Sequence, residues 1–224
     1  MSETTTASLQ HDHVAGAHPA ANVSQNSSGA VSSEDVRAWT KGLPPAHFEG
    51  FKWCPLCREP LALFDICGRV RLGCTGKDCL YVRWDGPSPV ALAIVLINGR
   101  IVLVRRGVPP CKGSWCLPGG FIEADESGDD AAIREFCEEA GMKVRVVKIL
   151  GAYTPCYDTN EVILVYLAEV VDGVLAHGDD ADAAETFSLE DLPENIAFPE
   201  HRKIIEDYLR FGELRSAIAD CKQH

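Results

Sequence analysis

Three glutamates in one short segment could bind a divalent cation. Glu135, Glu138 and Glu139 follow one another within five residues of chain. On a helix that turns by about 100° per residue, their side chains fall within an arc of about 100°. Like charges this close repel each other, and Mg²⁺ is bound by hard oxygen ligands such as carboxylates. By itself the pattern has two interpretations, a solvated acidic helix face and a metal site.

The sequence around the glutamates favours the metal site. It resembles the Nudix motif, G-x5-E-x7-R-E-U-x-E-E-x-G-U, in which U is a bulky apolar residue. Every constrained position is satisfied, by Gly120, Glu126, Arg134, Glu135, Phe136, Glu138, Glu139, Gly141 and Met142. The resemblance implies an enzyme that hydrolyses a pyrophosphate bond in a nucleotide-linked substrate. Water would attack a phosphorus of the diphosphate with the help of a divalent cation.

The resemblance also implies a role for each residue of the motif. Arg134 and Glu126 match the pair that braces the loop and the helix, since a planar guanidinium can fix a carboxylate in one orientation. We count both among the catalytic residues, together with the three glutamates. The residues expected beside the cation, Mg²⁺ or Mn²⁺, are Gly120, Glu135, Glu138 and Glu139.

Two close cysteine pairs indicate a second metal site. Cys54 and Cys57 enclose two residues, Cys74 and Cys79 enclose four, and sixteen residues separate the pairs. Four thiolates on two tight turns suit tetrahedral, structural Zn²⁺. So short a module buries too little surface to fold alone, so the metal would supply folding free energy. Cys67 is an alternative ligand, and incidental cysteines are the competing interpretation.

Composition and charge bear on the compartment and the partners. The formal net charge of −12 disfavours a large basic surface for DNA or for an anionic membrane. Residues 1–36 contain neither Lys nor Arg, and no stretch approaches the roughly 18 apolar residues of a membrane span. We therefore expect a cytoplasmic, reducing location without DNA or membrane partners. There, paired cysteines bind metal more often than they form disulfides.

The elements that must position these residues follow an α+β pattern. Asn98-Gly99 predicts a hairpin, because both residues tolerate positive φ. Gly141 is placed to end a helix over 127–140, whose apolar arc would include Cys137. The other expected elements are strands over 90–97, 100–105, 144–153, 161–171 and 185–189, an acidic loop over 172–185, and a helix from 199 to about 211.

These elements divide the chain into four parts. Residues 1–50 are expected to form a disordered tail with a short helix over 32–40, and residues 51–84 form the cysteine module. The resemblance implies a zinc ribbon there, and a Nudix fold, a mixed sheet sandwiched by helices, over 88–212. Residues 213–224 would be a C-terminal tail.

The order of zinc ribbon and Nudix domain is similar to two groups of enzymes, NADH pyrophosphatases and plant-type FAD and ADP-ribose pyrophosphatases. The Ser-Gln-Pro-Trp-Pro-Phe-Pro motif of the NADH group is absent from the region 151–158. We therefore expect a small-molecule nucleotide, FAD or ADP-ribose, as substrate. The alternatives are NADH or NAD-capped RNA, nucleoside-triphosphate sanitation, and, in another class, a non-catalytic ligand-sensing regulator. The oligomeric state stays open, with a homodimer as one option.

Two residues are candidates for contacts with the substrate. Arg106 could touch a phosphate, and Tyr157 could stack on an adenine or flavin ring. An ordinary surface charge and core packing are the competing interpretations. The general base is not assigned, because Ala183 stands where relatives often carry a carboxylate, and Asp182 or Glu185 would have to replace it.

Overall fold

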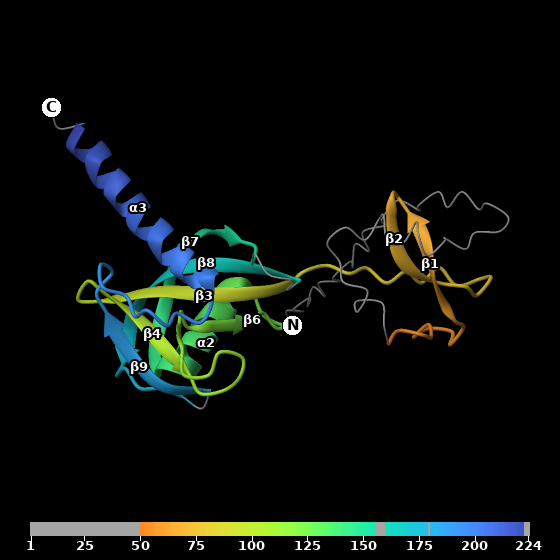
Figure 1. Cartoon of the computed structure of the whole chain (residues 1–224), viewed down its shortest axis with the longest axis horizontal. Coiled ribbons are helices and arrows are strands. Elements are labelled where there is room, and N and C mark those ends of the chain that lie inside the picture. The colour runs from red at the N-terminus through yellow and green to blue at the C-terminus, as the bar shows by residue number, and fades with distance from the viewer. Residues whose placement is uncertain (1–49, 156–159, 179, 222–224) are drawn as a thin grey trace, which may run out of the picture. The chain divides into compact units, whose positions relative to one another are not determined.

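The polypeptide forms two compact units, Met1–Trp84 and Asp85–His224. The structure, a computed structural model, describes residues 50–155, 160–178 and 180–221 (Figure 1). The short helix expected over 32–40, nearly all of the expected tail 1–50, and Tyr157 lie outside the described residues. In the described ranges, no helix combines the length and the apolar character that crossing a membrane requires.

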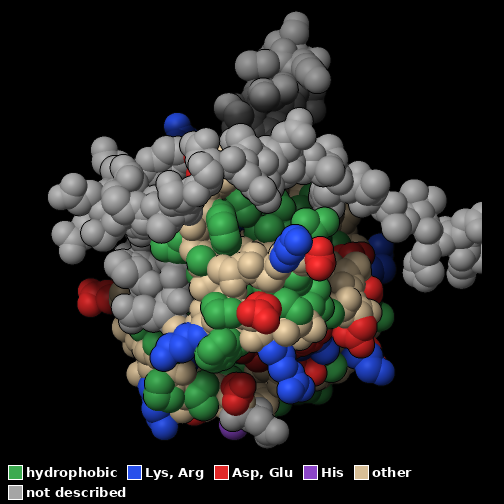
Figure 2. Space-filling view, turned by 90° about the vertical axis from the view of Figure 1, so that its right-hand side faces the viewer, with side chains coloured by type: hydrophobic (Ala, Val, Ile, Leu, Met, Phe, Trp, Pro, Cys, Tyr) green, Lys and Arg blue, Asp and Glu red, His purple; other side chains and the backbone are tan. Residues whose placement is uncertain are grey.

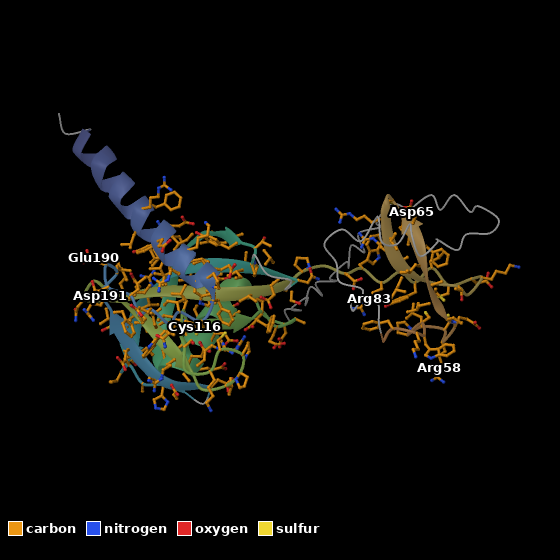
Figure 3. All side chains as sticks on the ribbon, in the orientation of Figure 1. Arg58, Asp65, Arg83, Cys116, Glu190 and Asp191 are labelled. Atoms are coloured by element: carbon orange, nitrogen blue, oxygen red, sulfur yellow. The ribbon has the colours of Figure 1, made fainter. Side chains whose placement is uncertain are left out.

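The cysteine-rich unit is built on one antiparallel hairpin. Cys67 and Gly68 form its turn, with φ angles of 55° and 76°, and the Gly68 amide donates a hydrogen bond to Asp65 at 2.9 Å. Figure 3 shows Asp65 near this turn and Arg58 at the other end of the unit. Cys67 is therefore far from Cys74, which ends the second strand. The two strands are β1 (Leu61–Ile66) and β2 (Arg69–Cys74).

Little apolar surface is buried inside this unit. Its buried hydrophobic side chains, within the described residues, are Cys54, Ile66 and Leu72. Large hydrophobic side chains stay exposed, namely Phe51, Trp53, Leu56, Leu80 and Trp84. Figure 2 shows one face of the molecule, on which hydrophobic side chains lie exposed among charged ones. The described part of this unit therefore has a small core, which is a weak source of stability.

The second unit is built on a seven-stranded mixed sheet. Its strand order is β5-β4-β3-β8-β7, while β6 also pairs with β3 and β9 with β4. β3 and β8 are parallel, and the other pairs are antiparallel. The predicted hairpin is confirmed, since Asn98 and Gly99 join β3 and β4 with φ angles of 52° and 77°. The bounds are β3 Ser88–Ile97, β4 Arg100–Arg106, β5 Trp115–Cys116, β6 Gly119–Phe121, β7 Met142–Tyr153, β8 Glu161–Gly173 and β9 Ala181–Phe187.

Two helices cover the two faces of this sheet (Figure 1). Successive side chains of β3 point to opposite faces, so Ala93 packs in the same core cluster as Phe136 of the first helix. The next residue, Ile94, packs with Ile204 of the second helix. The expected α+β architecture, a mixed sheet between helices, is confirmed. The helices are α2 (Gly128–Ala140) and α3 (Pro199–Cys221).

Three local expectations were wrong. The strand expected over 185–189 is β9, which begins at Ala181 because it pairs with β4 from there to Phe187. The acidic loop is therefore confined to the residues between Gly173 and Ala181. The last helix continues past 211 to Cys221, since most residues after Gly212 favour helix, so it takes up most of the range 213–224. Cys137 is exposed, because the buried stripe of α2 is narrower than expected.

Candidate active site and cysteine cluster

Arg134 joins the acidic side chains of the motif. Its Nε and Nη2 donate to the two oxygens of Glu126 at 3.0 Å and 2.7 Å. Its Nη1 donates to Glu135 at 2.8 Å and to Glu138 at 3.1 Å. Its Nη2 also donates to the carbonyl of Phe121 at 3.1 Å, which ties α2 to β6. One rigid guanidinium thus sets the orientation of three carboxylates.

The pKa values of these groups follow from their surroundings. The hydrogen bonds from Arg134 lower the pKa of Glu126 to about 2. Burial raises the pKa of Glu135, although Arg134 opposes the change. Burial also raises the pKa of Glu139 to about 7, against the hydrogen bond that it accepts from the Gly119 amide at 2.9 Å. A carboxylate buried in this way gains strongly from a nearby positive charge.

Two glycines allow the backbone to approach these carboxylates closely. Gly119 has a φ angle of 148°, and a Cβ atom there would lie 2.1 Å from the carbonyl oxygen of Ala91. A Cβ atom at Gly120 would lie 2.4 Å from a carboxylate oxygen of Glu135. Glycine is therefore required at position 119 for β6 to pack against β3, while Gly120 leaves room for the carboxylate of Glu135.

Local signals fix both ends of α2. Ser127 is the N-cap and accepts a hydrogen bond from the Asp130 amide at 3.4 Å. Gly141 ends the helix in the left-handed region, with φ of 70°, and its amide donates to the carbonyl of Cys137 at 3.0 Å. Because the helix is capped at both ends, the one-turn separation of Glu135 and Glu139 is well defined.

Asp182 and Glu185, the two expected substitutes for the general base, both lie on β9. Asp182 is paired with Arg105 at 2.5 Å, and Glu185 is exposed opposite Leu103 of β4. Instead, the charge of Asp180 contributes to the raised pKa of Glu139. Asp180 precedes β9, and its carbonyl accepts a hydrogen bond from the Gly107 amide at 2.8 Å. Asp180 is therefore within electrostatic range of Glu139, and strand spacing alone could not have revealed it.

Arg106 lies within electrostatic range of the same site. Its charge opposes the rise in the pKa of Glu139, its Nε donates to the carbonyl of Pro110 at 2.6 Å, and its guanidinium lies 5.3 Å from the ring centre of Phe198. The structure therefore brings Arg106 together with the motif. Tyr157, the other expected substrate contact, lies outside the described residues.

His201 was not singled out by the sequence. It is 7% exposed, and its Nδ1 accepts a hydrogen bond from the Leu117 amide at 3.0 Å. Burial lowers the pKa of His201 to about 4, so its ring is neutral near pH 7. A histidine on the apolar face of the last helix is the only signal that the sequence offers.

The four cysteines of the two pairs come together in the first unit. Their ligand atoms all lie within 4.8 Å of one another in Cys54, Cys57, Cys74 and Cys79. The Leu56 amide donates to Cys54 at 3.4 Å and the Gly76 amide donates to Cys74 at 3.3 Å. Each pair thus has one thiol that accepts a hydrogen bond from the backbone of its own turn.

The electronic environment of this cluster differs from thiol to thiol. Burial raises the pKa of Cys54, but hydrogen bonds from the backbone and from other cysteines outweigh it and lower the pKa to about 7. Burial raises the pKa of Cys74 to about 12. Cys116, labelled in Figure 3, belongs to the second unit and not to this cluster, and burial raises the pKa of its thiol to about 12 as well. Four thiols grouped in this way have the donor chemistry of a tetrahedral zinc site.

Comparison with known proteins agrees with this geometry. The family model of the NUDIX domain matches residues 87–208. An ADP-ribose pyrophosphatase of Methanocaldococcus jannaschii is 39% identical over 128 residues, which cover 56% of this chain and 75% of that protein. An NAD-capped RNA hydrolase, NudC, of Pseudomonas syringae is 29% identical over 154 residues, which cover 64% of this chain and 54% of the relative.

A solved structure shares the fold. The crystal structure of a NUDIX hydrolase from Nitrosomonas europaea has a TM-score of 0.64 and 24% identity, and the likeness covers 71% of this chain and 90% of the other. The family match spans more than half of the chain and includes every residue of the motif. The chain therefore belongs to the Nudix family and is a Nudix hydrolase, an enzyme of the pyrophosphatase type.

Proposed function

We propose that the chain hydrolyses the pyrophosphate of a nucleoside diphosphate linked to a second moiety, with ADP-ribose as the preferred substrate. The observation that carries this proposal is the arrangement of three carboxylates on α2, held by Arg134 and by the Gly119 amide. The first of the relatives above acts, by its name, on ADP-ribose. FAD has the same chemistry, a diphosphate between adenosine and a second group, and is our second choice.

We assign the divalent cation, Mg²⁺ or Mn²⁺, to Glu135, Glu138 and Glu139, with the Gly120 backbone beside it. The donor set fits, because these are hard oxygen ligands and two of them are partly stripped of water. When bound, the cation neutralises charge on the diphosphate.

The chain's own residues have distinct tasks in this proposal. Arg134 holds Glu126 and Glu135 in place, so the carboxylates need little reorganisation. Arg106 supplies a positive charge on the approach to Glu139, where a phosphate oxygen would lie. Asp180 is the carboxylate best placed to accept a proton from the attacking water, since it lies near Glu139 and is not tied to Arg105.

We also assign structural Zn²⁺ to Cys54, Cys57, Cys74 and Cys79. The support is the grouping of their sulfur atoms within 4.8 Å and the small core of the unit that carries them. Zinc would cross-link the two turns of a unit that cannot bury enough apolar surface on its own.

The test is a comparison of four substrates under one Mg²⁺ condition. We expect kcat/KM for ADP-ribose and FAD to exceed that for NADH and 8-oxo-dGTP by at least about tenfold, since recognition of the second moiety adds about 1–3 kcal/mol. Product analysis should show AMP as the common product of the first two. Absence of hydrolysis of all four compounds would contradict the proposal.

A second candidate is the hydrolysis of NADH or of an NAD cap on RNA. It is favoured by the match to NudC, which extends over 154 residues, and disfavoured by the missing motif at 151–158. In the same four-substrate comparison, a clear preference for NADH would select this candidate.

A further inference from the structure

A short backbone ladder leads from α3 to the candidate active site. The Trp115 amide donates to the carbonyl of Asn195 at 2.9 Å, and the Ala197 amide donates to the carbonyl of Trp115 at 2.7 Å. The chain then continues into α3 at Pro199, so the backbone pairing with Trp115 ends at Ala197. The next amide that points the same way, that of Leu117, has no backbone acceptor on this side and donates to Nδ1 of His201 at 3.0 Å.

The same stretch of chain ends on a proposed cation ligand. Two residues after Leu117, the amide of Gly119 donates to Glu139 at 2.9 Å. Between them, Pro118 has no N–H, and its carbonyl accepts a hydrogen bond from Ala93 of β3 at 3.0 Å. On one side the segment 117–119 is held by the side chain of His201, and on the other it is held by β3, through the carbonyl of Pro118 and the pairing of Gly119 with Leu92.

His201 is anchored firmly enough to fix that segment. Its ring lies 5.1 Å from that of Phe198, and its amide donates to the carbonyl of Phe198 at 3.0 Å. One turn further along α3, Ile204 and Ile205 are 1% and 0% exposed in the core beneath the sheet. These contacts tie the position of the imidazole to that of the helix.

We propose that His201 is a positioning residue that, through the Leu117 amide, places the Gly119 amide against Glu139. It touches neither the substrate nor the cation. The role in cation binding rests on the proposed function, whereas the placement of the segment 117–119 does not. Because Nδ1 accepts the hydrogen bond, the ring of the neutral histidine carries its proton on Nε2.

Three substitutions at His201 separate the position of the acceptor atom from the size of the side chain. In His201→Asn, Oδ1 stands as many bonds from the backbone as Nδ1 does, so it can accept from Leu117. In His201→Gln the amide group lies one bond further out, and in His201→Leu no acceptor remains. Ile205→Val, on the same helix, is the matched control, since it removes one buried methyl group and leaves the ladder intact.

The experiment combines two measurements on the full-length protein. Amide hydrogen exchange of Leu117 and Gly119 is followed without divalent cation, and Mn²⁺ binding is followed by calorimetry. We expect His201→Leu and His201→Gln to speed exchange at both amides and to weaken Mn²⁺ binding by about tenfold, the usual effect of losing a group that orients a ligand. His201→Asn should restore both to within about threefold of the parent, a difference below about 0.7 kcal/mol.

The outcomes separate this proposal from the proposed function. Unchanged exchange at Gly119 in His201→Leu would overturn the positioning role, as would equal weakening of Mn²⁺ binding by Ile205→Val. Should His201→Leu fail to fold, His201→Gln and His201→Asn still differ in the placement of the acceptor, and equal exchange in these two overturns the proposal. If the parent binds no Mn²⁺, the proposed function fails, while the exchange data still decide the role of His201.

Discussion

The two candidate metal sites are held together in opposite ways. The carboxylates of α2 are positioned by protein contacts, from Arg134 and from Gly119, inside a unit whose core includes fully buried side chains such as Phe136. The four cysteines belong to a unit whose described interior is small, and their side-chain contacts are with one another, at 3.3 Å and 3.6 Å. Protein contacts position the first site, whereas the second would depend on the proposed zinc ion for its stability.

The two proposed ions would therefore contribute in different ways. At the α2 site, burial raises the pKa of Glu139 to about 7, so the charged carboxylate is unfavourable in the metal-free protein. A bound cation would stabilise that charge. At the cysteine cluster, a bound zinc ion would add folding free energy. Loss of the first ion should therefore stop the reaction and leave the fold, while loss of the second should unfold its unit.

Removal of zinc should have the largest effect. A structural zinc site contributes on the order of 10 kcal/mol, so chelation should abolish amide protection in β1 and β2 while the strands of the second unit keep theirs. Cys57→Ser should also abolish amide protection in β1 and β2. Cys67→Ser, at the turn of the hairpin, is the control and should retain one zinc ion per chain by elemental analysis. Full amide protection of β1 and β2 in the zinc-free protein would contradict the proposal that this unit needs zinc to stay folded.

The second effect concerns the stability of the metal-free protein. The pKa of Glu139 is raised from 4.5 to about 7, so the stability linked to this group is present below pH 4.5 and is lost as the pH rises through 7. Glu139→Gln removes the charge, so at pH 8 without cation the variant should be more stable by up to about 3 kcal/mol. Urea unfolding of both proteins at pH 5 and pH 8 measures this difference, which should shrink at the lower pH.

A smaller effect is expected from Arg134→Lys. A lysine ammonium keeps the charge but cannot bind Glu126 with two parallel hydrogen bonds and reach Glu135 as well. The Mg²⁺ concentration for half-maximal rate should rise by about tenfold or more. Lys203→Arg, on the exposed side of α3, is the control and should leave this concentration unchanged; an unaffected Arg134→Lys would show that the carboxylates do not need the guanidinium.

The smallest effect distinguishes two neighbouring aspartates. Asp180→Asn should lower kcat by about tenfold if it accepts a proton from water, on the lower side of general-base effects. Asp182→Asn should stay close to the parent, because Asp182 is paired with Arg105 on the surface and such exposed pairs contribute little. The reverse order of the two variants would move the proton-accepting role to Asp182.

Local patterns in the sequence predicted much of this architecture. The α2 helix, its Gly141 cap and the Asn98-Gly99 turn each depend on residues close together in the chain, and the structure confirms them. The grouping of the two cysteine pairs was predicted from spacing, and their sulfur atoms do come together.

What the sequence could not predict depends on contacts between distant segments. The start of β9 is set by its pairing with β4, and Asp180, just before this strand, is within electrostatic range of Glu139. The hydrogen bond between Leu117 and His201 joins residues 84 positions apart. No local pattern encodes either contact, because both depend on how the sheet and α3 pack.

The most direct test of the central claim is the turnover of Glu139→Gln with ADP-ribose at saturating Mg²⁺. The substitution keeps the size of the side chain and an oxygen that can accept from Gly119. If the α2 carboxylates bind the cation, the variant should stay folded and its kcat should fall by at least about 10²-fold, the scale of lost transition-state charge stabilisation. Turnover close to that of the parent would contradict the assignment of the α2 carboxylates as the cation site.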